Sequence, residues 1–115
     1  RAILYSEESP AKEMIRSIDS LKDMGASIIA VPCNSAHFFY PEVKERIKGN
    51  WINMTECVSK KLVNDGFLNP LIIGGYVTVT KKIYSDYIAG SIYLDDEENQ
   101  LICHKVYQLL KKLLL

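Results

Sequence analysis

Short apolar runs alternate with amphipathic segments along almost the whole chain, and this alternation constrains the fold more than any other feature. The apolar runs cover residues 2–5, 26–32, 51–54, 71–76 and 91–94. The segments between them carry apolar side chains at three- and four-residue spacing, which is typical of helices packed on a sheet. Strands that alternate with helices are joined by right-handed crossovers and lie parallel. The sequence therefore predicts an α/β fold with a parallel sheet.

The predicted helices occupy the segments between and after these runs. Residues 11–25 have an apolar face, and Gly25 is placed to end that helix in a left-handed conformation. A second helix is predicted to begin between Ser35 and Pro41, where proline suits a first helical turn, and to end at Gly49. The remaining helices are predicted over residues 55–66, 79–90 and 95–115.

Two of these helices carry more specific expectations. Thr55 is suited to cap the helix over residues 55–66, and the apolar spacing places Cys57 on its buried face. The last helix begins with acidic residues and has an apolar stripe made of Leu101, Ile102, Val106, Leu109 and Leu110. Because the order of elements repeats on either side of Asn69 and Pro70, we expect two lobes. They would comprise residues 1–66 and residues 67–115.

The charge and cysteine content exclude several classes of partner and location. Fourteen basic and fourteen acidic residues cancel, without a long block of either sign, so no nucleic acid or membrane surface is expected as a partner. No apolar stretch approaches the roughly 20 residues that span a bilayer. Cys33, Cys57 and Cys103 are far apart and form no CxxC pair, which indicates reduced thiols, a cytoplasmic protein and no zinc site. A small molecule or a protein is the expected partner.

The segment VPCNSAHFFY, residues 31–40, places candidate functional groups directly after an apolar run. Ligands bind at the carboxyl ends of parallel strands, where Cys33, Asn34 and Ser35 would lie. A helix that begins there would lower the pKa of the Cys33 thiol and attract a carboxylate. Cys33 is either an acid/base thiolate or a packing residue, since free cysteines are often buried. His37 is a helix-start hydrogen bonder, a partly exposed ring or a partner that tunes Cys33.

The second half has an equivalent turn at residues 75–78. The hydroxyl of Thr78 and the backbone amides there could bind an anion, and the alternative interpretation is that Thr78 caps a helix. Cys103 and His104 are adjacent within a predicted helix and point to different faces. We therefore expect no joint metal site there and interpret Cys103 as structural.

PCNSAHFFY resembles the PCNTAH-type signature of the cofactor-independent aspartate/glutamate racemases, especially the aspartate racemase branch. RAIL resembles the segment after the Pro-Asp pair of that branch, GASIIAVPCNSAH its first catalytic strand and loop, and INM the strand that follows. GGYVTVTKKIY and DDEENQLICHKVYQLLKK resemble the family's Thr/Gly-rich turn and its lysine-bearing helix. The resemblance spans nearly the whole chain, and PCNSAH is its only highly specific element.

The resemblance implies two facing, pseudo-symmetric α/β lobes of the flavodoxin-like or Rossmann-like kind, each with one catalytic cysteine. One thiolate would remove the proton from the substrate's α-carbon and the other thiol would return a proton to the opposite face. Cys33 would be the first of these thiols. The residues implied to hold the substrate are Asn34, Ser35, Thr78, Arg1 and Lys111. The implied activity is amino-acid racemisation without pyridoxal phosphate, metal or nucleotide, by a protein that could be a homodimer.

The sequence departs from the family pattern in several places. Ser35 replaces the usual threonine, and Gly75 stands where a hydroxyl residue is common, so substrate preference could differ. The family's second cysteine lies in a GCTE-type motif beyond the lysine-bearing helix, and neither that motif nor the family's first strand is in this sequence. We therefore expect the chain to be the middle of a longer protein and to be inactive alone. The alternatives are a one-cysteine decarboxylase or isomerase, a small-acid-binding or assembly lobe, and a redox-sensing thiol.

Overall fold

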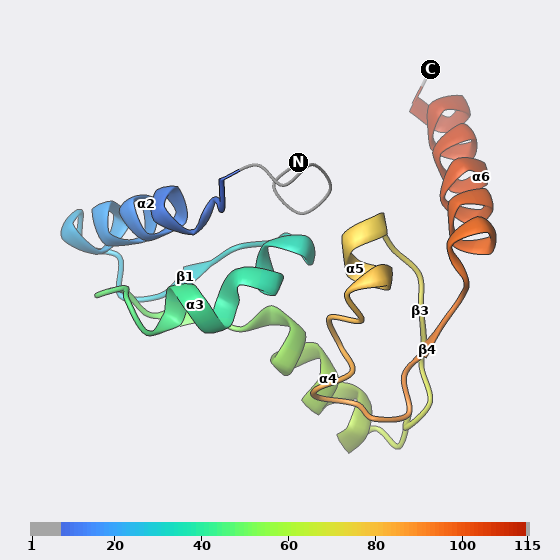
Figure 1. Ribbon diagram of the computed structural model, residues 1–115, viewed down its shortest axis with the longest axis horizontal. Helices are drawn as coiled ribbons and strands as arrows, with labels where there is room; N and C mark the ends of the chain where they lie inside the picture. Colours follow the sequence, from blue (N-terminus) through green and yellow to red (C-terminus); the bar gives the residue numbers. More distant parts are fainter. Residues whose placement is uncertain (1–7, 115) are drawn as a thin grey trace. The chain divides into compact units, whose positions relative to one another are not determined.

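The structure of the protein is a computed structural model, and it describes residues 8–114 (Figure 1). The strand predicted over residues 2–5 lies outside the described residues. Backbone contacts divide the chain into two compact units, with the division between Val58 and Ser59. Each unit has helices and its own pair of parallel strands. The predicted α/β fold with parallel sheets is therefore confirmed.

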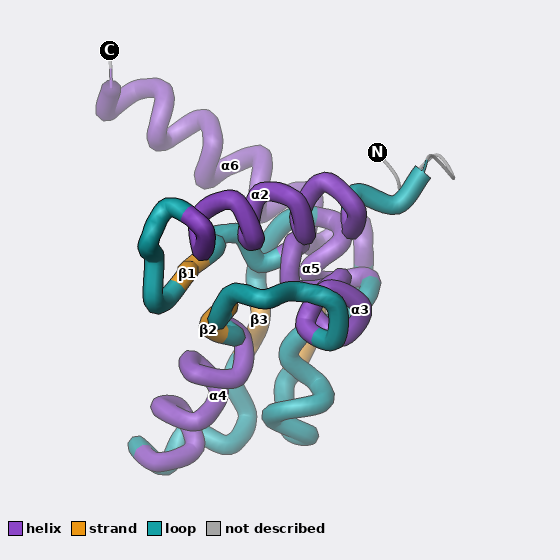
Figure 2. Tube along the Cα trace, turned by 90° about the vertical axis from the view of Figure 1, so that its left-hand side faces the viewer, coloured by secondary structure: helices purple, strands orange, loops and turns teal. Residues whose placement is uncertain are grey.

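The first unit contains a two-stranded parallel sheet with helices before, between and after its strands. Its elements are α2 (Ala11–Asp23), β1 (Ile29–Ala30), the 3-10 helix η1 (Ser35–Phe39), α3 (Tyr40–Lys44) and β2 (Trp51–Ile52), followed by the beginning of α4 (Met54–Asn64). In the sheet, Ile29 pairs with Trp51 and Ala30 with Ile52. Figure 2 shows α2 passing over the sheet formed by β1 and β2.

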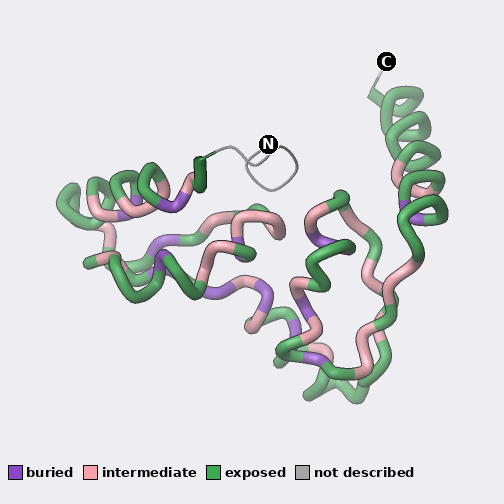
Figure 3. The backbone as a smooth tube through the Cα atoms, in the orientation of Figure 1, coloured by how far each residue is buried: buried purple, intermediate pink, exposed green. Residues whose placement is uncertain are grey.

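The core of the first unit is formed by α2, α3 and the sheet. Its buried apolar residues are Ala11, Ile18, Ile29, Val43 and Trp51. Burying one side chain the size of isoleucine contributes about 1.5–3 kcal/mol to folding. Figure 3 shows these buried stretches on α2 and on the strands beneath it. The apolar spacing of residues 11–25 therefore predicted the helix and Ile18 on its packed face, but Leu21 and Met24, at the end of that face, are exposed.

Two glycines at the ends of predicted helices have different roles. Gly25 has φ +101°, and it and Ala26 donate backbone hydrogen bonds to the carbonyls of Lys22 and Leu21, which closes α2 as predicted. The prediction that Gly49 ends a helix is wrong, because α3 already ends at Lys44. Gly49 instead passes close to the core. A Cβ at this position would lie 2.9 Å from side-chain carbons of both Ile18 and Ile29.

Helix α4 begins one residue earlier than the sequence predicts. The carboxamide oxygen of Asn53 accepts hydrogen bonds from the Glu56 N–H at 3.1 Å and from the Thr55 hydroxyl at 2.7 Å. Asn53 therefore caps the helix, and the expected cap, Thr55, lies inside it, because Asn53 precedes it and is at least as good a cap. Cys57 is exposed, so the prediction that it lies in the core is wrong. The buried positions of α4 are Thr55 and Ser59, one turn apart, which turns Cys57 outward.

The second unit repeats the pattern of a parallel strand pair with helices. Its elements, after the end of α4, are β3 (Leu71–Ile72), α5 (Tyr76–Thr80), β4 (Ile92–Tyr93) and α6 (Asp96–Leu114). Leu71 pairs with Ile92 and Ile72 with Tyr93. The buried apolar residues of this unit are Val79, Tyr84 and Ile88.

The helix predicted over residues 79–90 is wrong in both its start and its end. The observed helix, α5, covers Tyr76–Thr80 and ends because Lys82 adopts a left-handed conformation with φ +48°. The N–H groups of Lys82 and Ile83 then bond the carbonyls of Val79 and Thr78, which completes a helix-terminating motif normally made by glycine. The sequence gives no sign of this end, since lysine rarely adopts a positive φ.

Helix α6 agrees with the sequence in extent but not in burial. The Asp95 carboxylate caps it by accepting the Glu98 N–H at 2.8 Å. Of the predicted apolar stripe, Leu101, Val106, Leu109 and Leu110 are exposed. The four strands in the described part of the chain cover two residues each and are shorter than the apolar runs, because each pairs with one neighbour along a short ladder. Among residues 8–114, no helix is both long and apolar enough to cross a membrane.

Candidate functional site

The loop that follows β1 carries the candidate thiol. Cys33 lies three residues beyond Ala30, the last residue of β1, and its side chain is exposed. Its backbone N–H donates to the carbonyl of Val31 at 2.8 Å, which turns the chain sharply after the strand. The 3-10 helix η1 then begins at Ser35, within the range that the sequence predicts for a helix start. Cys33 is thus an accessible thiol at the carboxyl end of a parallel strand, and its interpretation as a packing residue is wrong.

The surroundings of the Cys33 sulfur favour its ionised form. Its Sγ lies 3.3 Å from the Ser35 hydroxyl oxygen. A hydrogen bond from the Ser35 hydroxyl lowers the pKa of the Cys33 thiol below its ordinary value, and the backbone N–H groups of Ala36 and Ser35 act in the same direction. Partial burial opposes this and raises the pKa. The net lowering makes the thiolate, the form that can accept a proton or attack, more abundant near neutral pH.

His37 contacts the backbone of the Cys33 loop. Its ring is buried, with 5% exposure, so its interpretation as a partly exposed ring is wrong. Nδ1 lies 2.8 Å from the Cys33 carbonyl oxygen, and Nε2 accepts the N–H of Met54 at 3.1 Å. The ring of His37 lies against those of Trp51 and Tyr40, with centroid distances of 5.1 Å and 6.2 Å. The prediction of a hydrogen-bonding histidine at the helix start is confirmed.

In the second unit, side chains of α6 hold the turn after β3 through hydrogen bonds to its backbone. Gly75 precedes α5 in an extended conformation, and Thr78 lies inside the helix at 4% exposure, so the alternative that Thr78 caps this helix is wrong. The Asn99 carboxamide donates to the Gly74 carbonyl at 2.8 Å and accepts the Gly74 N–H at 3.5 Å. Cys103 donates to the same carbonyl at 3.3 Å. Cys103 is therefore structural, as predicted, and Asn99 is a loop-holding residue that the sequence analysis missed.

Of the two basic residues implied by the resemblance, Lys111 lies away from the turn after β3 and Arg1 lies outside the described residues. Lys111 lies in the last turn of α6, and its ammonium is 4.9 Å from the ring centroid of Tyr107. It is twelve residues beyond Asn99, about 18 Å along a helix. Within the second unit, the fold therefore does not bring Lys111 to the turn at Gly74. Arg1 lies outside the described residues. Cys33, Asn34 and Ser35 are brought together in one loop.

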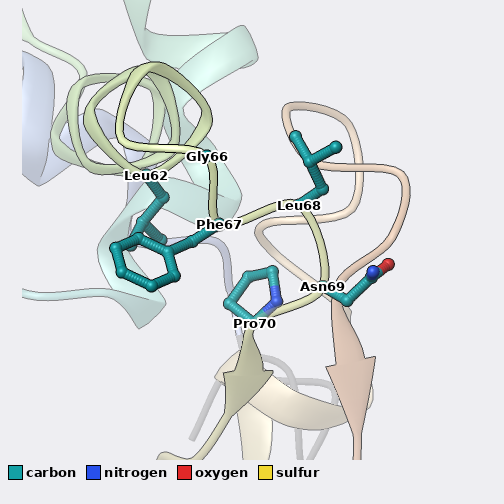
Figure 4. A pocket seen from close by; sticks show the side chains of 6 residues that line it. All are labelled: Leu62, Gly66, Phe67, Leu68, Asn69 and Pro70. Carbon is teal, nitrogen blue, oxygen red and sulfur yellow. The ribbon is translucent and has the colours of Figure 1, made fainter.

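A cavity lies in the second unit, and its lining has no titratable side chain. It has a volume of about 420 Å³ and is lined by Leu62, Gly66, Phe67, Leu68, Asn69 and Pro70 (Figure 4). Its walls are mostly apolar, and Asn69 supplies the one polar side chain. Nothing in this lining could carry acid/base chemistry. Among residues 8–114, no three His, Cys, Asp or Glu side chains are arranged to hold a metal ion.

Comparison with known proteins gives one consistent family. The family model described as Asp/Glu/hydantoin racemase matches residues 2–110. The broad specificity amino-acid racemase RacX of Bacillus subtilis is 25% identical over 80 residues, which cover 70% of this chain and 35% of RacX. The chain thus spans about a third of the length of this curated relative.

Two solved structures share the fold. The aspartate racemase of Picrophilus torridus superposes with a TM-score of 0.76 at 27% identity, covering 91% of this chain and 46% of that one. An aspartate racemase homologue from Pyrococcus horikoshii superposes with a TM-score of 0.73 at 20% identity, covering 84% of this chain and 45% of that one. In both cases the chain corresponds to less than half of the solved protein.

Proposed function

The chain belongs to the Asp/Glu/hydantoin racemase family, and from this premise we propose that the complete protein is an amino-acid racemase of the aspartate/glutamate type. The observation that carries the proposal is the exposed thiol of Cys33, placed after β1 with the Ser35 hydroxyl 3.3 Å from its sulfur. We further propose that the reaction needs no pyridoxal phosphate, metal or nucleotide. A thiol with a lowered pKa can accept and release a proton by itself.

In the proposed reaction, the Cys33 thiolate removes the proton from the substrate's α-carbon. The C–H bond breaks, an S–H bond forms, and the electron pair passes into the adjacent carboxylate as an enolate-like charge. A second thiol then gives its proton to the opposite face of the carbon, which inverts the centre and leaves that sulfur as a thiolate. The proposal assigns that second role neither to Cys57, which lies in the same unit as Cys33, nor to Cys103, which is bonded to the Gly74 carbonyl. The second thiol would come from the rest of the complete protein.

The roles of the remaining site residues are part of the same proposal. Asn34 and Ser35 lie beside Cys33 and would bind the substrate through side chains and N–H groups. Thr78 would contribute from the turn after β3 and Arg1 from the chain start, where Arg1 would neutralise a carboxylate. Lys111 lies about 18 Å along α6 from the residue that holds this turn, so its proposed part, neutralising the enolate-like charge, requires a site that extends beyond the turn. We propose that the two units are parts of two lobes in a protein that could form homodimers. The sequence places the boundary between the lobes after residue 66, and the backbone contacts divide the units between Val58 and Ser59. Free cysteines support a cytoplasmic location.

The test is racemisation by the complete protein in D₂O. L-aspartate, L-glutamate and other L-amino acids are each incubated with the wild type, with Cys33→Ser and with Cys57→Ser as the matched control. We expect the wild type to produce the D-isomer with deuterium at the α-carbon. Cys33→Ser should lower the rate by at least about 10³-fold, because a hydroxyl is a far weaker acid than a thiol. Cys57→Ser should racemise normally.

The outcomes separate the alternatives for Cys33. Racemisation retained in Cys33→Ser would remove this residue from the mechanism. Release of CO₂ or isomerisation of a dicarboxylate by the wild type, abolished in Cys33→Ser and without inversion of amino acids, would indicate the one-cysteine enzyme. Binding of small acids without turnover would indicate a binding lobe.

A further inference from the structure

In the first unit, the side chain of His37 joins two loops that follow neighbouring strands. The ladder between β1 and β2 ends at the pair Ala30 and Ile52. Cys33 lies three residues beyond this pair on one strand, and Met54 lies two residues beyond it on the other. The His37 ring spans the gap, with Nδ1 2.8 Å from the Cys33 carbonyl oxygen and Nε2 3.1 Å from the Met54 nitrogen. His37 thus continues the connection where the sheet stops.

The two partners of His37 fix the tautomer of its ring. The Met54 backbone N–H is a donor, so Nε2 must accept with its lone pair and carries no proton. Nδ1 therefore carries the proton of the neutral ring and donates it to the Cys33 carbonyl. A doubly protonated ring would lose the bond to Met54. Both nitrogens are thus engaged by backbone groups in one tautomer.

The packing around His37 excludes a role in proton transfer with substrate. The ring is 5% exposed and lies against Trp51 and Tyr40. Its contact with Cys33 is to the carbonyl oxygen and not to the sulfur. Any influence on the thiol must therefore pass through the backbone of the loop.

From this geometry we infer that His37 is a positioning residue: as a neutral ring protonated on Nδ1, it ties the Cys33 loop to the first turn of α4 and so holds the thiol among its hydrogen-bond donors. The donors that reach the Cys33 sulfur come from Ser35 and Ala36, in the same turn as the carbonyl that His37 holds. If that carbonyl moves, the sulfur and its donors lose their alignment. The catalytic consequence rests on the proposed racemase function, whereas the effect on the thiol does not.

The sharpest variant is Met54→Pro in the complete protein. Met54 is the first residue of α4 and follows the cap residue Asn53, a position where proline is well tolerated. The substitution removes the N–H that Nε2 accepts and leaves His37 unchanged. Met54→Ala is the matched control, since it removes the side chain but keeps the N–H. His37→Asn is the second variant, because its amide can still donate to the Cys33 carbonyl but is too short to reach Met54.

The readout is the rate of Cys33 alkylation by iodoacetamide between pH 5 and 10, followed on the Cys33 peptide by mass spectrometry. Exposed Cys57 serves as the internal reference. We expect Met54→Pro and His37→Asn to slow alkylation of Cys33 at pH 7 by about three- to tenfold and to move its profile to higher pH. Met54→Ala should match the wild type. In racemisation, kcat should fall while KM changes little, because the thiol acts in the transition state.

Unchanged Cys33 profiles in folded Met54→Pro and His37→Asn would overturn the inference. Loss of helical circular dichroism in both variants would also overturn it, by making His37 a residue required for folding. If the wild type does not racemise amino acids but the alkylation profiles shift as expected, the proposed function fails and the positioning role of His37 stands.

Discussion

The sulfur of Cys33 and the hydroxyl oxygen of Ser35 lie 3.3 Å apart, two positions from each other in the chain. This contact is the largest of the influences that lower the pKa of the Cys33 thiol, and the N–H of Ala36 is the next. Both donors stabilise the charged sulfur without themselves carrying charge. Because Cys33 is exposed, the effect depends on hydrogen-bond geometry more than on the removal of water.

Replacing Ser35 with alanine is expected to raise the pKa of the Cys33 thiol. The acid limb of racemisation by the complete protein, which reports formation of the Cys33 thiolate, should then move to higher pH. Ser35→Thr keeps the hydroxyl and should leave the limb close to that of the wild type. The measurement is kcat/KM against pH, with Cys33 alkylation as an independent check. An acid limb that stays in place in Ser35→Ala would show that the hydroxyl does not tune the thiol.

Cys33 and Asn99 show which functional and structural roles a sequence pattern can and cannot predict. The resemblance of PCNSAH to a racemase signature indicated Cys33 without any structure. Asn99 gave no such sign, because an asparagine within a helical segment is usually exposed. Its burial and its two bonds to Gly74 arise only when the turn after β3 is brought to α6.

At the scale of elements, the close passage of Gly49 beside the core determines how tightly α2 packs on the sheet. Side-chain carbons of Ile18, on α2, and Ile29, on β1, both approach the position where a Cβ would lie. Because Gly49 has no side chain, Ile18 and Ile29 can pack close to its backbone.

Gly49→Ala is expected to destabilise the protein by about 1–3 kcal/mol, since an added methyl in a packed core forces neighbours to shift. Ile29→Val removes the Cδ1 that the methyl would meet, so the double variant should lose less stability than the sum of the single changes. Gly75→Ala is the control, because a Cβ there meets nothing within 4 Å. Urea unfolding of the complete protein measures these differences. Equal stability of Gly49→Ala and the wild type would contradict the packing argument.

At the scale of the whole molecule, the two units share one structural arrangement. Each has a pair of parallel strands, and in each a buried polar side chain, His37 or Asn99, holds the turn after the first strand. The chain nevertheless spans 46% of the aspartate racemase that it resembles in structure. The two-base reaction proposed for the complete protein needs a second acid/base group on the opposite face of the substrate.

Residues 1–115 expressed alone are therefore expected to form no D-amino acid, because Cys33 by itself cannot supply a proton to the opposite face of the carbon. Chiral chromatography after incubation in D₂O measures this, with the complete protein at equal concentration as the control. Formation of the D-isomer at a comparable rate would show that this chain already contains both bases.

The sequence by itself determined the α/β class, the parallel direction of the strands, the approximate extents of α2 and α6, and the position of Cys33 after β1. These features follow from local spacing of apolar residues and from one specific motif, so they need no knowledge of distant contacts. Tertiary structure decided the left-handed turn at Lys82, the cap at Asn53, the exposure of Cys57 and the close packing at Gly49. Each depends on which segments meet in space. The same holds for His37, whose role became visible only when β2 brought Met54 beside the Cys33 loop.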